Sequence, residues 1–345
     1  MEQKRVTIKD ISEKLGVSNG VVSKALNNKR GVKKDLREKI LKTADELGYH
    51  INKVAQSMAR NTIVIGVVIP STAENYFSFL EKGLDIEFER LRDYNVEKRY
   101  YVIENLYSSI DTVNALNQCI EDEINGIILC DFFPGGLEKV FSKLEEKRIP
   151  IVIIGDSQST TNKYLCSVQV DAYSSGQMAA EMLSLCTKKD ANVAIFVGNK
   201  DNIEHKLKIQ GFIDSLKEYG LNSVGVYETH DDDTIALQLI KKILGNNKNL
   251  HGLYSATSNF ASIGKIIEEE KLDLKVVCTD IDSVVCHYLK SGIVQCTIFQ
   301  DLERQARTAV RVLYEHIAEH KKIEKTVHIS PILVIKSNLH TYLKK

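Results

Sequence analysis

Short polar side chains gather at the start of a short helical segment near the N-terminus. Ser18 can cap this segment, and Val22, Ala25 and Leu26 follow at helical spacing and predict its buried face. The opposite face then carries Asn19, Gly20, Val21, Ser23 and Lys24. Amide, hydroxyl and ammonium groups placed in this way can form hydrogen bonds with the edges of base pairs in the major groove of DNA.

Two flanking helices would hold this segment in place. Thr7 can cap a first helix, with Asp10 three residues later as in a capping box, and Gly16 can end it with a left-handed residue. One apolar stripe follows the cap, formed by Ile8, Ile11 and Leu15. A third helix is predicted from about Lys34 to Leu47. Together these helices have the layout of a helix-turn-helix, in which the N-terminal end of the second helix enters the major groove.

A second group of polar residues follows predicted β-strands farther along the chain. These are Asn75 and Phe77 after Ile63–Pro70, Asp156 after Ile149–Gly155, Ser258 after Gly252–Ala256, and Asp280 at the end of Leu274–Asp280. Carboxylates, amides and hydroxyls beside an aromatic ring suit a polyhydroxylated ligand such as a sugar. Three of these residues also have a structural alternative, since Asp156 and Asp280 after strands can cap helices and Phe77 can belong to a core.

Strands and helices alternate over residues 62–345, which predicts parallel sheets. Amphipathic stretches such as Phe77–Arg92, Ser175–Cys186 and Lys206–Tyr219 lie between the apolar runs. About 280 residues exceed what one core holds, so two α/β lobes are expected, with ligands in the cleft at the carboxyl ends of the strands. The predicted fold class is therefore α/β, with an all-α helix-turn-helix head before a two-lobed body.

The two parts differ in charge. Residues 1–60 contain 14 Lys and Arg against 7 Asp and Glu, a net charge of +7, whereas the whole chain has 46 of each and the remainder is therefore −7. A basic head on an acidic body favours phosphate contact at one end only. The alternative for the head alone is a small helical bundle whose basic face is merely solvated.

Other chemistry is sparse in this sequence. The seven cysteines show no paired spacing, the nine histidines show no zinc spacing, and no glycine-rich phosphate loop is present. Asp231–Asp233 is interpreted as a turn that opens a helix rather than a metal site. We therefore expect no enzyme activity, no metal and no cofactor. With no signal peptide and no membrane-spanning run, a cytoplasmic location is expected.

The run from Val6 to Asn27 and the run from Glu46 to Arg60 resemble the head of the LacI-type family of bacterial transcriptional regulators. The family pattern T-I-x-D-[IV]-A-x-x-A-G-V-S, then V-S-[RK]-x-L-N and A-x-x-L-G-Y-x-x-N-x-x-A-x-x-L, is mostly present at matching spacing. The resemblance extends over essentially the whole chain and implies a periplasmic-binding-protein-like sensor. The implied parts are a head (1–50), a hinge (51–61) and a sensor (62–345), with an N-lobe (about 62–170 and 299–330) and a C-lobe (about 171–298 and 331–345).

The resemblance also assigns roles in DNA binding. Asn19 and Gly20 match the two positions where the family contacts bases, but Gly20 has no side chain and offers only close approach. Lys24 matches a position that is usually Arg or Lys, and a contact with guanine O6 and N7 would discriminate by roughly 1–3 kcal/mol. Val21 replaces the usual Thr and suits a thymine methyl group. Three residues would contact phosphates or cap helices: Thr7, Ser23 and Asn27.

Residues Asn52–Arg60 resemble the hinge of that family, where a short helix forms on operator DNA. Asn52, Ala55 and Met58 are the expected DNA contacts, and Met58 matches the apolar wedge that is usually Leu. Unstacking a base step costs a few kcal/mol, and this cost is offset because bent DNA wraps more of the protein surface. The alternative for this segment is a plain linker.

Two further ligand-binding residues come from the resemblance. Lys208 stands four residues before Phe212, where the family usually has Arg in R-x-x-G-[FW], and Gln300 resembles the glutamine of ribose-type sensors. Ser258 and Asn259 replace the family's Asn-Asp. Lysine cannot form the bidentate fork of arginine, so this position lacks the two-pronged contact that arginine would make with an ordinary monosaccharide. Alternatively, Lys208 lies on a solvated helix face.

The sequence thus predicts a ligand-responsive, sequence-specific transcriptional regulator. We expect a repressor that binds a pseudo-palindromic operator in double-stranded DNA as a homodimer, with a sugar or similar small polar effector between the lobes. The alternative is a solute-binding protein or a sugar-acting enzyme of the same sensor fold. A secreted binder would need a signal peptide and an enzyme would need an acid–base pair, and neither stands out in the sequence.

Overall fold

The computed structural model divides into two compact units. The N-terminal head comprises Met1–Asn61 and is grouped with Asp93–Asn95, and the larger body comprises Thr62–Arg92 and Val96–Lys345. The head is helical and the body consists of helices and mainly parallel strands, which confirms the predicted fold class. The residues described are 6–26, 30–49, 61–70, 74–103, 109–130, 136–155, 163–246, 249–257 and 260–343.

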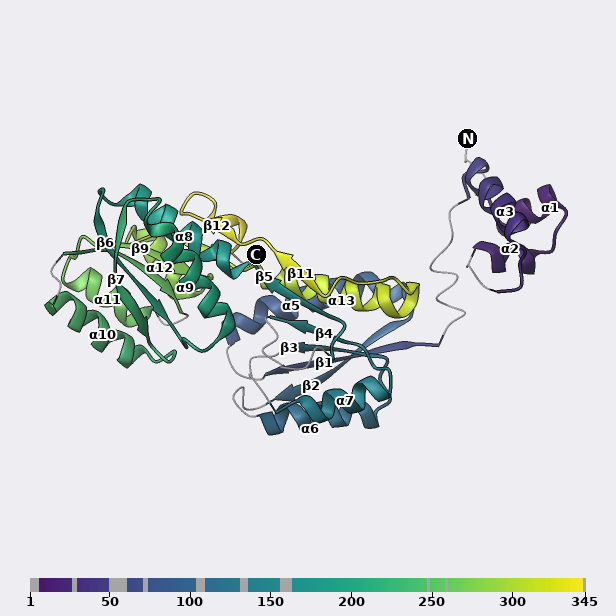
Figure 1. The fold of residues 1–345 in the computed structure, drawn as a ribbon, viewed down its shortest axis with the longest axis horizontal. Helices are drawn as coiled ribbons and strands as arrows, with labels where there is room; N and C mark the ends of the chain where they lie inside the picture. Colours follow the sequence, from purple (N-terminus) through teal and green to yellow (C-terminus); the bar gives the residue numbers. More distant parts are fainter. Residues whose placement is uncertain are drawn as a thin grey trace. The chain divides into compact units, whose positions relative to one another are not determined.

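Three helices form the head: α1 (Ile8–Leu15), α2 (Asn19–Leu26) and α3 (Lys34–Glu46) (Figure 1). The Asp10 carboxylate accepts hydrogen bonds from the Thr7 backbone N–H at 2.7 Å and the Thr7 hydroxyl at 2.6 Å, as a capping box predicts. Gly16 ends α1 with φ 64°, the left-handed region that favours glycine. The core between the helices comprises Ile11, Val22, Ala25, Ile40 and Ala44.

The first sheet of the body has six parallel strands in the order β11-β5-β4-β3-β1-β2. The strands are β1 (Ile63–Pro70), β2 (Val96–Ile103), β3 (Gly126–Cys130), β4 (Ile151–Ile154), β5 (Cys166–Val170) and β11 (Thr326–Ile329). Helices α6 (Ser109–Glu121) and α7 (Glu138–Glu146) cover one face. Helices α5 (Glu74–Leu91) and α13 (Leu302–Glu319) cover the other (Figure 1), and the short helix η1 (Arg92–Tyr94) follows α5.

The second sheet has the order β12-β10-β9-β8-β6-β7, in which only β12 runs antiparallel to its neighbour among the paired strands described. Its strands are β6 (Ala191–Val197), β7 (Leu221–Glu228), β8 (Leu250–Ala256), β9 (Lys275–Thr279), β10 (Val294–Phe299) and β12 (Ile332–Val334). Helices α8 (Ala172–Cys186) and α9 (Ile203–Leu216) pack on one face. The other face packs against α10 (Asp233–Asn246), α11 (Ala261–Glu269) and α12 (Ser283–Ser291).

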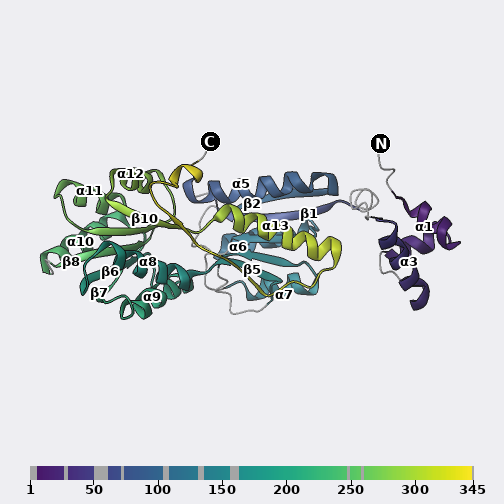
Figure 2. The same cartoon turned by 90° about the horizontal axis from the view of Figure 1, so that it is seen from above.

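The chain passes between the two sheets three times (Figure 2). The connections lie at Asp171 between β5 and α8, at Gln300–Asp301 between β10 and α13, and at Ser330–Pro331 between β11 and β12. After the third connection and β12, the short helix η2 (Leu339–Thr341) lies near the C-terminus. Asp171 caps α8 and Asp301 caps α13 through their side chains, so two of the three connections are held by helix caps.

Helices α8 and α9 approach each other closely because each has a glycine at the contact. A methyl group on Gly176 would lie 2.1 Å from the Lys208 carbonyl oxygen, and one on Gly211 would lie 2.0 Å from the Tyr173 carbonyl oxygen. These distances are too short for any other residue at either position. This contact fixes α9, and with it Lys208, against the second sheet.

Candidate functional site

The exposed face of α2 carries the polar residues that the sequence places there. Asn19, Gly20 and Lys24 are all exposed to solvent. Ser18 precedes the helix, and its side-chain oxygen accepts a hydrogen bond from the Val21 backbone N–H at 3.4 Å, in a weak N-cap. The amide of Asn19 and the ammonium of Lys24 are thus presented outward from one short helix.

The opposite side of α2 explains this exposure. Val22 is 0% exposed and Ala25 is 2% exposed, and both pack against Ile11 and Ile40 in the core of the head. Because those apolar contacts set the rotation of α2 about its axis, the polar face cannot turn inward without exposing the core. Val21 and Ser23 lie between the two faces and are partly buried.

Of the remaining five predicted DNA contacts, only Thr7 lies within the described residues. Thr7 is the N-cap residue of α1, where it forms a capping box with Asp10. The other four predicted residues, Asn27, Asn52, Ala55 and Met58, lie outside the described residues.

In the body, Lys208 on α9 is only 2% exposed. Its Nζ lies 2.5 Å from Glu204 Oε1, one helical turn earlier, and donates to Gln300 Oε1 at 3.1 Å. The alternative that Lys208 lies on a solvated helix face is therefore wrong. The buried ammonium has an acidic partner and an amide partner, as a buried charge requires.

Gln300 connects Lys208 to Asp280 at the carboxyl ends of β9 and β10. The Gln300 backbone N–H donates to Asp280 Oδ1 at 3.2 Å, and its side-chain Nε2 donates to Oδ2 at 2.6 Å. Gln305 Nε2 donates to the Gln300 carbonyl oxygen at 2.8 Å, which ties the connection to α13. We refer to Glu204, Lys208, Gln300 and Asp280 as the Lys208 network.

Burial and charge act in opposite directions within this network. Burial by itself would lower the pKa of Lys208, but attraction from Glu204, Tyr254 and Asp280 outweighs it, so the pKa lies above its ordinary value. Burial would raise the pKa of Glu204, but attraction to Lys208 holds it below its ordinary value. Burial raises the pKa of Asp280 to about 6, against the opposing pull of Lys208 and Gln300. Lys208 and Glu204 therefore form a charged pair.

Glu204 and Tyr254 belong to this site but are absent from the predicted ligand residues. The Tyr254 side chain is 0% exposed; its hydroxyl oxygen lies 3.2 Å from Thr279 Oγ1, and its ring packs 5.6 Å from that of Phe212. The sequence did contain a signal for Glu204, because Glu and Lys four residues apart on a predicted helix are neighbours.

The structure thus brings Lys208, Asp280 and Gln300 together, as expected for ligands at the carboxyl ends of parallel strands. Two other predicted residues, Asn75 and Phe77, lie in the first turn of α5. Asp156 and Ser258 lie outside the described residues.

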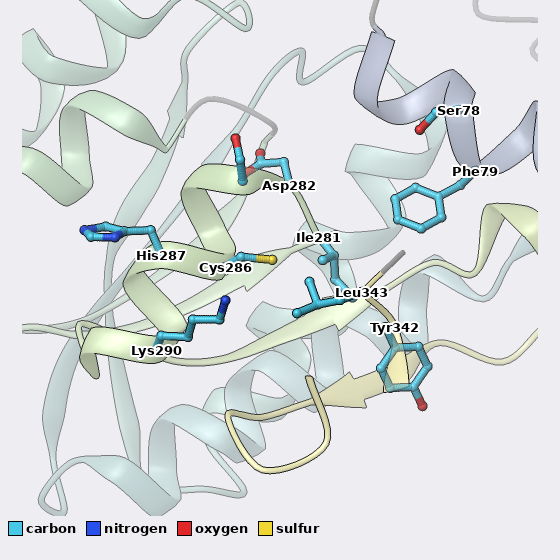
Figure 3. A pocket seen from close by; sticks show the side chains of 10 residues that line it. Ser78, Phe79, Ile281, Asp282, Cys286, His287, Lys290, Tyr342 and Leu343 are labelled. Carbon is cyan, nitrogen blue, oxygen red and sulfur yellow. The ribbon is translucent and has the colours of Figure 1, made fainter. Parts of the chain in front are cut away.

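A surface cavity of about 420 Å³ (Figure 3) is lined in part by Ile281, which directly follows Asp280 in the sequence. Phe79 of α5 lines it on one side, and it is also lined by Lys290 of α12 and by Asp282, the N-cap residue of α12. Phe79 contacts Phe299 with ring centroids 5.6 Å apart, and Phe299 directly precedes Gln300. Lys208, Asp280 and Gln300, the predicted ligand residues whose side chains the structure describes, do not line this cavity.

The described residues offer neither a metal site nor a cysteine activated for thiol chemistry. No cluster of three or more His, Cys, Asp or Glu side chains there could hold a metal. Asp232 caps α10 by accepting from the Thr234 backbone N–H at 2.7 Å, so the acidic run opens a helix as predicted. None of the seven cysteines forms a disulfide, and burial raises the pKa of Cys166 to about 11, which disfavours a reactive thiolate. No helix in the described part of the chain is long and apolar enough to span a membrane.

The pKa of Asp280 gives a pH-dependent stability. Because its pKa is higher in the folded state, the folded protein binds more protons than the unfolded chain between the unfolded value of 3.8 and about 6. Stability is therefore gained as the pH falls through 6, and the Asp280→Asn variant should lack this gain. When the pH is lowered from about 8 to about 5, the unfolding free energy of the wild type should rise by about 1 kcal/mol relative to that of the variant. Urea unfolding of both proteins at each pH would measure it, and parallel pH profiles would contradict the assignment.

Known proteins resemble both units. Residues 7–52 match the family described as "Bacterial regulatory proteins, lacI family", and residues 65–322 match "Periplasmic binding protein domain". Catabolite control protein A of Streptococcus mutans is 28% identical over 335 residues, covering 93% of this chain and 94% of that protein. The transcriptional repressor PurR of Pasteurella multocida is 24% identical over 348 residues, covering 98% and 99%.

Solved structures support the fold of the body. GanP, a glucose-galactose binding protein from Geobacillus stearothermophilus, matches with a TM-score of 0.71 and 22% identity. The match covers 81% of this chain and 99% of that one. The two-sheet arrangement of the body is therefore that of periplasmic binding proteins.

Proposed function

The chain belongs to the LacI family of bacterial regulatory proteins, and from this premise we propose that α2 binds an operator while the body senses a small polar ligand. The chain is a ligand-responsive, DNA-binding transcriptional repressor, and membership of a family of regulators confirms that it is not an enzyme. One observation carries the assignment: Asn19 and Lys24 are exposed on a helix whose other face is locked into the core of the head.

The DNA contacts divide into base contacts and positioning contacts. Asn19 and Lys24 offer an amide and an ammonium to base edges, and Val21 at the margin of the face offers methyl groups to thymine. Gly20 allows close approach of the backbone. Four further residues position the head on phosphates or cap its helices: Thr7, Ser18, Ser23 and Asn27. The net charge of +7 over residues 1–60 supports this interface.

We propose that the chain acts as a homodimer on a pseudo-palindromic operator. Two α2 helices would occupy successive major grooves, one per protomer. The hinge at residues 51–61 would form in the minor groove, with Asn52 and Ala55 in contact and Met58 as the wedge. The head would span residues 1–50 and the body residues 62–345, with lobes about 62–170 with 299–330, and about 171–298 with 331–345.

The ligand site we propose is the cleft between the lobes, and the effector is a sugar or similar small polar molecule. Lys208, Asp280 and Gln300 form its described part, joined by hydrogen bonds at the strand ends. The further proposed contribution comes from Asn75 and Phe77 in the first turn of α5, and from Asp156 and Ser258. Similarity to a protein named as glucose-galactose binding is in keeping with this ligand class.

Ligand binding would close the cleft and rotate the lobes, which changes the spacing of the two hinges and so the affinity for the operator. Such coupling is reciprocal between ligand and DNA. A repressor of this kind acts where the chromosome is, so we propose a cytoplasmic location.

Selection of duplexes from random DNA with the full-length protein tests the proposal. The expected product is a symmetric site whose half-sites lie about one helical turn apart, because a two-fold dimer presents α2 twice. Recovery of no common sequence at physiological salt would contradict it, since basic charge alone gives only non-specific binding.

A further inference from the structure

Lys208 is the only cation within the four-residue Lys208 network, and its charge is already matched by an acid from the same helix. Glu204 Oε1 lies 2.5 Å from Lys208 Nζ, and the Glu204 side chain is more exposed than the Lys208 side chain, at 26% against 2%. An anion approaching from solvent would therefore meet Glu204 before it could reach Lys208.

The remaining polar groups of the network are also committed. The amide oxygen of Gln300 accepts from Lys208, and its amide nitrogen donates to Asp280. With Asp280 ionised, the network carries two carboxylates and one ammonium, a net charge of −1. A second anion would thus be repelled by two acids and would find no unmatched cation.

We propose that Glu204 is a specificity-determining residue that occupies the anion-binding position of Lys208, so that the cleft accepts neutral polyhydroxylated ligands and rejects carboxylates and phosphates. This inference rests on the proposed role of the Lys208 network in ligand binding. Hydroxyl groups can donate to Glu204 and Asp280 and accept from Lys208 without adding charge. An acidic ligand would have to displace Glu204 from Lys208 and leave its partly buried carboxylate without that partner.

The test replaces Glu204 by alanine in the full chain and uses acetate as the probe. The Glu204→Ala variant leaves the buried Lys208 without its acid, so Tm should fall by roughly 5 °C. Acetate can fill the vacated position, so saturating acetate should restore about half or more of that fall with a hyperbolic dependence on concentration. Acetate should not raise the Tm of the wild type in this way. Adding Lys208→Met to the Glu204→Ala variant should abolish the rise in Tm that acetate causes.

The surface pair Lys265–Glu269 provides a matched control. It has the same four-residue spacing on a helix, but its side chains are 70% and 64% exposed. Glu269→Ala should therefore change Tm little and show no rescue by acetate beyond that of the wild type. Rescue of Glu204→Ala no larger than that of Glu269→Ala would reduce Glu204 to a structural role and overturn the proposal.

Ligand discrimination supplies the second arm. The probes are two pairs of a neutral sugar and its carboxylate: D-galactose with D-galacturonate, and D-glucose with D-glucuronate. In neither pair should the wild type bind the carboxylate more tightly than the neutral sugar. Glu204→Gln, which keeps the side-chain size, should shift the ratio toward the acid by roughly 10-fold or more in any pair that binds. Preference of the wild type for an acid would overturn the proposal. Because neither arm contains DNA, failure here and failure to select an operator remain distinguishable.

Discussion

Replacement of Lys24 by alanine is expected to lower operator affinity by roughly 10- to 100-fold, since a well-placed base contact contributes about 1–3 kcal/mol. Affinity for random DNA should fall only a few-fold, because that binding depends on the summed charge of the head. Lys24 is exposed on α2, so its removal disturbs no buried contact. Fluorescence anisotropy with the selected operator and with a scrambled duplex measures both losses.

Lys9→Ala is the matched control for this experiment. Lys9 lies on α1, is 74% exposed and pairs only loosely with Glu13 at 3.7 Å, so its removal subtracts the same charge away from α2. It should weaken operator and scrambled duplex by the same small factor. If Lys24→Ala also weakened both duplexes equally, Lys24 would contact phosphate rather than bases.

A methyl group at Gly211 is expected to destabilise the body by about 3 kcal/mol, at the upper end of overpacking effects. The added carbon would lie 2.0 Å from the Tyr173 carbonyl oxygen, so α8 and α9 must separate. Their separation opens the core that contains Phe212 and Ala180 and shifts Lys208, whose own carbonyl faces Gly176. Thermal and urea unfolding of Gly211→Ala should show the loss.

Gly245→Ala tests whether the effect comes from the helix contact. Gly245 lies in α10, and nothing lies within 4 Å of a methyl group placed there. This substitution should be neutral or stabilise by up to about 1 kcal/mol, because alanine favours helix over glycine. If Gly211→Ala and Gly245→Ala changed the unfolding free energy by the same amount, α8 and α9 would not meet as closely as described.

Continuous apolar runs made most central strands predictable. The runs Ile63–Pro70 and Gly126–Cys130 coincide with β1 and β3, because strands buried on both faces in parallel sheets lack polar positions. The predicted starts of two helices were each three residues too late. α8 begins at Ala172 instead of Ser175 and α9 at Ile203 instead of Lys206, since both first turns follow caps whose role depends on the preceding loop.

Strands with mixed polarity were not predicted. β5 (Cys166–Val170) contains Ser167 and Gln169, and β7 (Leu221–Glu228) is an edge strand with exposed polar positions. Such segments become strands through pairing with neighbours distant in sequence, which local pattern does not contain. β11 and β12, which link the two sheets near the C-terminus, are only four and three residues long and were missed for the same reason.

The candidate site was predictable in part. Asp280 follows from its place at the end of a strand, and Lys208 and Gln300 from family resemblance, and the structure joins all three. The pairing of Lys208 with Glu204 was not predicted, because spacing shows that two helical residues are neighbours but not whether they are buried. Burial of Lys208 is set by the close contact of α8 and α9, a tertiary feature.

The most direct test of the account measures operator affinity of the full chain with and without a saturating ligand found by thermal shift. Binding in the body should change the operator Kd by roughly 5- to 150-fold, and the operator should change the ligand Kd by the same factor. An operator Kd that stays the same while the ligand is demonstrably bound would contradict the claim that the body controls the head.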